Sequence, residues 1–262
     1  MALDTGTNKS FFEYYAAASE SEETLVRFNT VRRKALSLMR TLGEKGPFDV
    51  ADVGCGAGTQ AMLWSKDGHT VNAIDINEPL VELGRERASK EGLDLNFSVG
   101  SANDLPWLNN SIDICLVPEL LEHVSDWQGC LDEFSRILRP GGLLYLSTTN
   151  MLCPMQQEFD LLLYSWYPKR LKHYYERISV TTRPELVNHA KYPAVNWFTP
   201  YSLKHELLNR DFSKIFDRFD CLLLDGESHR KRIVVKIMDA LPPLRWFGHV
   251  CTPSTTVFAI KA

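Results

Sequence analysis

The sequence predicts an α/β fold, in which a mostly parallel sheet of seven strands carries helices on both faces. Two observations support this prediction. Between residues 48 and 150, short apolar segments alternate with amphipathic segments. The segments 221–225 and 255–262 look like the last two strands. Because neighbouring parallel strands need a crossover between them, the alternation indicates right-handed βαβ units and a sheet covered on both faces.

The N-terminal part is predicted to be helical. Apolar residues recur at spacings of three and four from residue 11 to residue 42, which favours one long helix. Gly43, Gly46 and Pro47 end it. We expect residues 1–47 to be a helical segment that caps the core.

Residues 48–150 are the predicted core. Their alternation gives five strands separated by three helices and by polar loops. The strands are expected at 48–54, 70–75, 95–100, 111–119 and 142–150, and the helices at 59–66, 80–91 and 127–138.

The remainder of the chain is divided at residue 200. From 151 to 198 the periodicity is lost over a stretch too long for a simple connection, so we expect 151–200 to be an insert that covers a substrate. Residues 201–262 return to the core with a helix at 201–212 and the last two strands.

Composition narrows the class of protein. The chain has 262 residues, of which 44% are hydrophobic and 24% are charged, as expected of a soluble globular protein. Its net charge of −4 argues against a nucleic-acid binder, which needs a surplus of Lys and Arg. Six scattered cysteines and the lack of a signal peptide or a long apolar run predict a cytoplasmic protein with reduced thiols.

The first chemical signal is the turn Asp52–Gly58, DVGCGAG, between the first strand and the first core helix. Glycine allows a ligand to approach the backbone and adopts angles that a Cβ forbids. Asp75 closes the next strand about twenty residues later, where a carboxylate can accept both ribose hydroxyls of a nucleoside. A nicotinamide cofactor, another nucleotide, or a purely structural turn beside a helix-capping aspartate are the alternatives at this point.

Four motifs in order resemble those of class I methyltransferases that use S-adenosylmethionine (SAM), which share a Rossmann-like fold. They are DVGCGAG, AID ending at Asp75, GSANDLPW from Gly100, and LRPGGLLYLST from Leu138. The resemblance covers residues 48–150 and implies SAM as the cofactor. It also implies the cofactor contacts, which are Gly54, Cys55 and Gly56 at the methionine part, Asp75 at the ribose, Ile76 on the adenine, and Ser101 with Ala102 at the adenine edge. The family often has Asp where this chain has Ser101.

A second resemblance is to the ubiquinone-biosynthesis O-methyltransferases. RFNTVR, residues 27–32, resembles an element of that group whose second arginine is implied to hold the SAM carboxylate, here Arg32. A guanidinium can make a forked pair with a carboxylate. Arg33 and Lys34 are alternatives in a shifted register, and an exposed helical arginine without this role is another.

VPELLEHVSDW, residues 117–127, resembles a further element of the same group. By that resemblance Glu119, Glu122 and His123 hold a divalent cation such as magnesium, although imidazole suits manganese or zinc better. In the alternative, no metal binds, and His123 with Glu122 acts as a base or orients the loop. Pro118 replaces a family Met that contacts SAM, which leaves a backbone contact there.

The insert contains the apolar, aromatic and then basic stretch 159–178. One interpretation is a lid over an aromatic or lipid-like acceptor, with its basic edge resting on a membrane surface. The other is a core helix followed by a solvated basic turn. Candidates for the lining of an acceptor site are Tyr164, Trp166, Tyr167, Tyr174 and Trp197.

These signals together predict a SAM-dependent methyltransferase with a small-molecule acceptor, above all the oxygen of a phenolic or catechol-like compound. An N- or C-methyltransferase of another natural product, sugar or lipid is the alternative within the class. Outside it, the alternatives are a SAM-binding module without catalysis and an NAD-dependent oxidoreductase.

Overall fold

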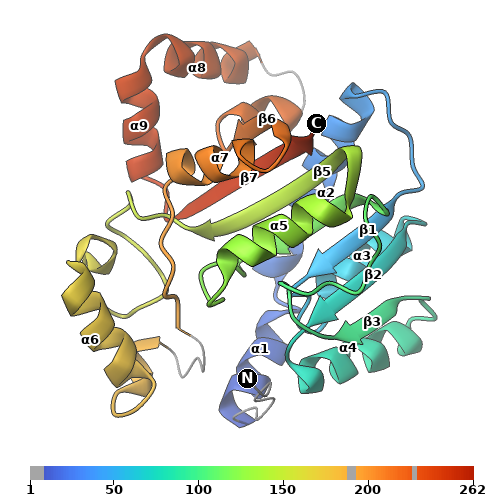
Figure 1. Cartoon of the computed structure of the whole chain (residues 1–262), viewed down its shortest axis with the longest axis horizontal. Helices are drawn as coiled ribbons and strands as arrows, with labels where there is room; N and C mark the ends of the chain where they lie inside the picture. The colour runs from blue at the N-terminus through green and yellow to red at the C-terminus, as the bar shows by residue number, and fades with distance from the viewer. Residues whose placement is uncertain (1–8, 188–192, 226–228) are drawn as a thin grey trace.

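The computed structural model describes residues 9–187, 193–225 and 229–262 (Figure 1). Seven strands form one sheet in the order β3-β2-β1-β4-β5-β7-β6. The first five pair in parallel, whereas β7 runs antiparallel between β5 and β6. The strands are β1 Asp49–Val53, β2 Thr70–Asp75, β3 Asn96–Val99, β4 Ile112–Pro118, β5 Leu138–Thr149, β6 Phe212–Asp217 and β7 Ser254–Lys261. The predicted fold class is therefore confirmed.

Helices cover both faces of the sheet (Figure 1). They are α1 Lys9–Ala18, α2 Glu22–Thr41, α3 Thr59–Lys66, α4 Glu78–Lys90, α5 Trp127–Ile137, α6 Lys169–Ser179, α7 Pro200–Leu208, α8 His229–Ala240 and α9 Pro242–Val250. Three short 3₁₀ helices are η1 Tyr164–Trp166, η2 Pro184–Val187 and η3 Asp220–Asp225.

The core has two layers because successive side chains of a strand point to opposite faces. On one face Cys115 and Leu144 pack against α5 and α7, in a cluster that includes Phe134. On the other face Ile114 and Tyr145 pack with α2 and α3. Burial on both sides explains why β4 and β5 are almost continuously apolar.

The single N-terminal helix expected at 11–42 is wrong in one respect, because the chain forms two helices, α1 and α2. The break falls at residues 19–21, where Ser21 caps α2 by accepting a hydrogen bond from the Thr24 N–H at 3.2 Å. A serine at this position stabilises a helix start, and this local hydrogen bond outweighs the continuing apolar pattern.

The sixth strand is also misplaced in the sequence analysis. The segment 221–225 lies in the 3₁₀ helix η3, whereas β6 is formed by residues 212–217, of which only Phe212 was part of the helix expected at 201–212. Cys221 is buried in the cluster shared with α2, so tertiary packing accounts for its apolar surroundings without a strand. The helices α8 and α9 between η3 and β7 were not predicted.

The insert expected at 151–200 contains η1, α6 and η2, and α6 lies on the side of the molecule toward which β5 ends (Figure 1). Its small apolar cluster is built on Phe159, Tyr164 and Val187. Within the described ranges, no helix has the length and apolar character that crossing a membrane requires.

Candidate active site

The turn after β1 lies at the carboxyl end of the sheet, where β1 and β2 end side by side. Gly54, Gly56 and Gly58 all have positive φ, at 76°, 52° and 72°. The N–H groups of Gly54 and Cys55 both donate to the carbonyl of Ile74, at 2.8 and 3.1 Å. The turn is thus fixed to β2 before any ligand binds.

Asp75 connects three elements, two through its carboxylate and one through its backbone carbonyl. Its Oδ2 accepts from the Gly56 N–H and its Oδ1 from the Asn77 N–H, each at 2.8 Å. The Asp75 carbonyl accepts from the N–H of Gly100, which follows β3. Burial raises the pKa of Asp75, and these backbone donors counter that effect. A carboxylate has about four acceptor positions, so two remain for hydroxyl groups of a ligand.

The glycines of the turn serve different purposes. A Cβ on Gly56 would meet nothing within 4 Å, so this part of the backbone is open to a ligand. A Cβ on Gly58 would lie 2.5 Å from the ring of Phe97, so Gly58 is required by packing. At Gly54 a Cβ would lie 3.2 Å from the Leu120 side chain.

The residues expected to contact an adenine lie at neighbouring strand ends. Ile76 is 38% exposed directly after β2, which leaves a large apolar surface beside Asp75. Ala102 is buried after β3, and the Ser101 hydroxyl donates to Asn103 Oδ1 at 2.6 Å. The structure therefore brings Ile76 and Ala102 to the edge that Asp75 occupies.

Sequence reasoning missed the buried pair of Asp52 and Gln60. Gln60 Nε2 donates to Asp52 Oδ1 at 3.1 Å, while Asp52 Oδ2 and Gln60 Oε1 have no hydrogen-bond partner within the described parts of the chain. Burial raises the pKa of Asp52 to about 7. Unpaired acceptors behind an open glycine turn fit a ligand that brings hydrogen-bond donors, as the ammonium group of SAM would.

The segment after β4 holds the predicted catalytic residues. Pro118 ends β4 opposite Ser147, and Glu119 follows with a positive φ of 50° and an ion pair to Arg27. Glu122 is 1% exposed and accepts a hydrogen bond from the Thr148 hydroxyl at 2.8 Å.

Burial raises the pKa of Glu122 well above its ordinary value, and neighbouring Glu158 and Glu119 raise it further. This environment favours the protonated form of Glu122, which makes it a poorer proton acceptor than an exposed glutamate. His123 is half-buried, and its backbone N–H donates to the carbonyl of Leu120 at 3.0 Å.

The metal set expected at Glu119, Glu122 and His123 does not assemble. Among the residues that the structure describes, no group of three or more His, Cys, Asp or Glu side chains could hold a metal ion. Glu119 is paired with Arg27, and burial of Glu122 favours its protonated form, which is a poor ligand for a divalent cation. In this arrangement the three side chains do not fit a divalent cation. Their role as metal ligands stays a prediction.

Arg32 also has partners other than the expected carboxylate. Its guanidinium donates to the Leu63 carbonyl at 2.6 Å and to Asn29 Oδ1 at 2.9 Å, and it pairs with Asp67 at 3.2 Å. These contacts hold α2 against α3. The arginine of the same element that reaches the segment after β4 is Arg27, at the first position of RFNTVR.

The aromatic residues suggested as a lining are only partly brought together. Tyr164, Tyr167 and Trp197 belong to one cluster with Phe159 and Tyr175, in which the Tyr164 and Phe159 rings stack at 4.0 Å. Trp166 and Tyr174 are exposed by 56% and 48%, although the Tyr174 ring contacts that of Tyr175 edge-on, with centroids 5.4 Å apart.

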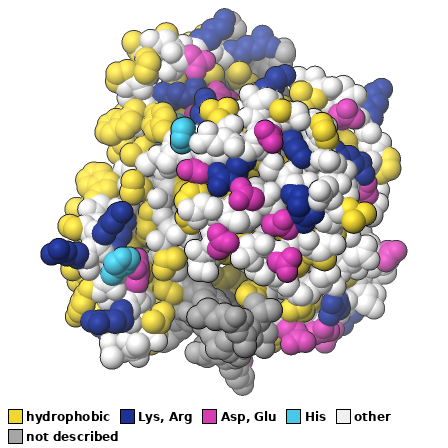
Figure 2. Space-filling view, in the orientation of Figure 1, with side chains coloured by type: hydrophobic (Ala, Val, Ile, Leu, Met, Phe, Trp, Pro, Cys, Tyr) yellow, Lys and Arg dark blue, Asp and Glu magenta, His cyan; other side chains and the backbone are white. Residues whose placement is uncertain are grey.

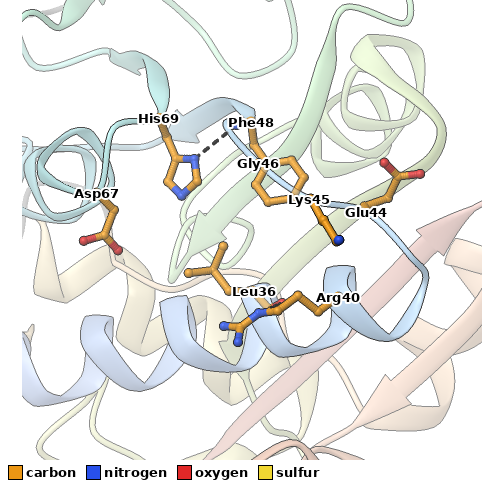
Figure 3. Close-up of a pocket in the computed structure, with 8 residues that line it drawn as sticks. All are labelled: Leu36, Arg40, Glu44, Lys45, Gly46, Phe48, Asp67 and His69. Carbon is orange, nitrogen blue, oxygen red and sulfur yellow. Dashed lines mark hydrogen bonds between the residues drawn. The ribbon is translucent and has the colours of Figure 1, made fainter.

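A separate hollow lies at the opposite end of the sheet (Figure 3). It has a volume of about 380 Å³ and lies before the starts of β1 and β2, next to Phe48 and His69. The His69 ring accepts a hydrogen bond from the Phe48 N–H at 3.1 Å. Because the glycine turn follows the other ends of these strands, this hollow is not part of the candidate active site.

Comparison with protein families supports the assignment of the turn. Residues 51–146 match the family model described as a methyltransferase domain. A curated relative, the ubiquinone biosynthesis O-methyltransferase of Coxiella burnetii, is 34% identical over 122 residues, which are 47% of this chain and 51% of the relative. The chain thus spans about half the length of the curated relatives it matches.

Solved structures share the fold over the whole chain. The PH0226 protein from Pyrococcus horikoshii OT3 has a TM-score of 0.59 at 16% identity, covering 98% of this chain and all of that one. A geranyl diphosphate methyltransferase in complex with SAM has a TM-score of 0.55 at 16% identity, covering 100% and 94%. The expected resemblance to SAM-dependent methyltransferases is confirmed.

The packing at Gly58 gives a test of the turn. Gly58→Ala is expected to lower the free energy of unfolding by about 2–4 kcal/mol, because the new methyl group collides with Phe97 and a positive φ is costly for alanine. Gly68→Ala is the control, since Gly68 has φ 85° and open space. It should cost only about 1–2 kcal/mol. Equal losses in urea unfolding would contradict the packing role.

Proposed function

We propose that the protein transfers the methyl group of SAM to the oxygen of a phenolic or catechol-like small molecule. The match of residues 51–146 to a methyltransferase-domain model and the similarity to curated O-methyltransferases support this proposal. The observation that carries the cofactor is the Asp75 carboxylate, fixed to the open glycine turn with two acceptor positions left. The name of the curated relatives supports oxygen as the methylated atom.

The proposed cofactor contacts follow the strand ends. Asp75 accepts the ribose hydroxyls, and Ile76 packs on the adenine. Ser101 and Ala102 lie at the adenine edge. The backbone of the turn from Gly54 to Gly56 borders the methionine part, and Pro118 offers a backbone carbonyl near the reacting centre.

SAM supplies a methyl group that is already activated by its sulfonium. The chain then needs to align the acceptor oxygen, exclude water, and accept the hydroxyl proton. We assign the proton to His123, because burial of Glu122 favours its protonated form and so weakens it as a base. Glu122 instead orients the segment after β4 through its hydrogen bond with Thr148.

We also propose peripheral contact with a membrane through residues 159–178. Leu162, Leu163 and Trp166 are exposed by 81%, 41% and 56%, and α6 begins with exposed Lys169 and Arg170. Figure 2 shows apolar side chains gathered along the side of the molecule that carries α6 and α9, with basic side chains beside them. Exposed apolar groups flanked by cations are typical of helices that rest on anionic lipid.

The cofactor assignment is tested by calorimetric titration with the demethylated product, S-adenosylhomocysteine (SAH). Asp75→Ala should weaken SAH binding at least 100-fold, because two hydrogen bonds to a charged acceptor are lost together with the anchoring of the turn. Asp94→Ala, at an exposed loop position, should bind as the wild type does. Unchanged SAH affinity in Asp75→Ala would refute the site.

The proton acceptor is tested by turnover of catechol acceptors. His123→Ala should lower kcat by about 10²–10⁴ and leave SAH affinity unchanged. His205→Ala, on the exposed side of α7, is the matched control. A chelator should have no effect, since the three candidate ligands do not converge. An unaltered kcat in His123→Ala would show that His123 is not the proton acceptor. Loss of activity with chelator would show that a metal ion takes part.

Membrane contact is tested by co-sedimentation with vesicles. Binding to vesicles that contain phosphatidylglycerol should exceed binding to pure phosphatidylcholine and should fall with salt. The double variant Leu162→Ser with Trp166→Ser should lose binding, because it removes the apolar contact. Leu208→Ser, half exposed at the end of α7, should retain it. Wild-type protein that stays in the supernatant under every condition would overturn the proposal.

A further inference from the structure

Lys172 is a buried cation of α6. Its residue is 8% exposed, and its ammonium lies 4.3 Å from the ring centroid of Trp197 and 5.7 Å from that of Tyr164. Within residues 9–187, 193–225 and 229–262 this ammonium makes no ion pair and no hydrogen bond. The nearby carboxylate of Glu176 is bound to His173 Nδ1 at 2.8 Å.

Aromatic faces replace little of the water that a buried ammonium loses. A cation over an aromatic ring gains only a small part of the free energy that an unpaired charge loses when it is buried. This loss of hydration lowers the pKa of Lys172 to about 8, although the carboxylate of Glu176 acts in the opposite direction. An arriving anion would remove this penalty.

Trp197 adds a second unused donor at the same place. Its indole Nε1–H is buried and has no acceptor among the residues that the structure describes. A buried N–H without a partner is destabilising, so this donor and the ammonium of Lys172, which lies over the same indole, indicate a missing acceptor rather than simple packing.

This corner is attached to the segment that carries the proposed proton acceptor. Asn196, next to Trp197, donates from its side chain to the carbonyls of Leu121 and Val124, at 2.8 and 2.6 Å. The Glu122 carbonyl in turn accepts from the N–H groups of Val195 and Asn196, at 2.8 and 3.1 Å. A group bound by Lys172 and Trp197 therefore lies beside the loop from 119 to 123.

We propose that Lys172 and Trp197 bind an anionic group, a carboxylate or a phosphate, that the methyl acceptor carries. The proposal rests on the proposed function and narrows it, because the acceptor then has a hydroxyl to be methylated and an acid group that fixes its orientation. The ammonium supplies the charge, and the indole N–H supplies a directed hydrogen bond.

The test measures, by calorimetry and by tryptophan fluorescence, how tightly small anionic and neutral probes bind to wild-type protein loaded with SAH. The probes are 3,4-dihydroxybenzoate against neutral 3,4-dihydroxybenzamide, and phenyl phosphate against phenol. At least one anionic probe should bind tenfold or more tightly than its neutral partner, and the matched pairs separate carboxylate from phosphate. The preference should fall as the pH rises above about 8, since only the protonated ammonium attracts the anion.

Variants then assign the preference to its donors. Lys172→Met should abolish the preference for the anionic probe, and Lys172→Arg should keep part of it. Trp197→Phe should reduce the preference three- to tenfold, because it keeps an aromatic ring but removes the indole N–H. Lys169→Met, at an exposed position of the same helix, is the control. SAH affinity should be unchanged in all four variants.

Two outcomes overturn the proposal. One is equal affinity of the wild type for the charged and neutral members of both pairs. The other is a Lys172→Met variant that still prefers the anionic probe, whether or not its thermal stability has changed. Failure of the proposed function is recognised separately, as no methyl transfer to any acceptor by a protein that still binds SAH and the anionic probe.

Discussion

The candidate site depends on one constraint, the attachment of the glycine turn to the end of β2 through Asp75. The carboxylate accepts hydrogen bonds from the Gly56 N–H and from the N–H at the start of α4. The Ile74 carbonyl accepts from the N–H groups of Gly54 and Cys55. A turn with three residues at positive φ would otherwise sample many conformations. Because it is fixed beforehand, a nucleoside finds its acceptors already in place, and less entropy is lost on binding.

Polar groups accumulate where the parallel strands end, and the structure leaves several of them buried. Asp52 and Glu122 lie inside the protein with raised pKa values, and Glu122 is held through Thr148. Buried acids of this kind stay neutral more readily than exposed ones. They contribute to the site as hydrogen-bonding groups, as the bond between Glu122 and Thr148 shows.

The segment after β5 completes the arrangement on the acceptor side. In its aromatic cluster the rings of Phe159 and Tyr164 stack with their centroids 4.0 Å apart. Lys172 of α6 lies over the ring of Trp197, which packs against the same cluster. In this view the aromatic residues act as a support for two donors, and the acceptor is selected by its charge as well as by its ring.

The sequence by itself determined the parallel core and the cofactor turn, because both leave a local pattern: apolar segments alternate with amphipathic ones, and a glycine-rich turn is followed by an acid at the end of the next strand. Only the tertiary structure decided features set by distant partners. β6 formed at 212–217 because it pairs with β7 there, and Arg32 bonds to the Leu63 carbonyl because α2 packs on α3. The contact of Lys172 with Trp197 could not be predicted from the sequence, because it brings α6 onto a segment 25 residues further along the chain that carries no periodic pattern.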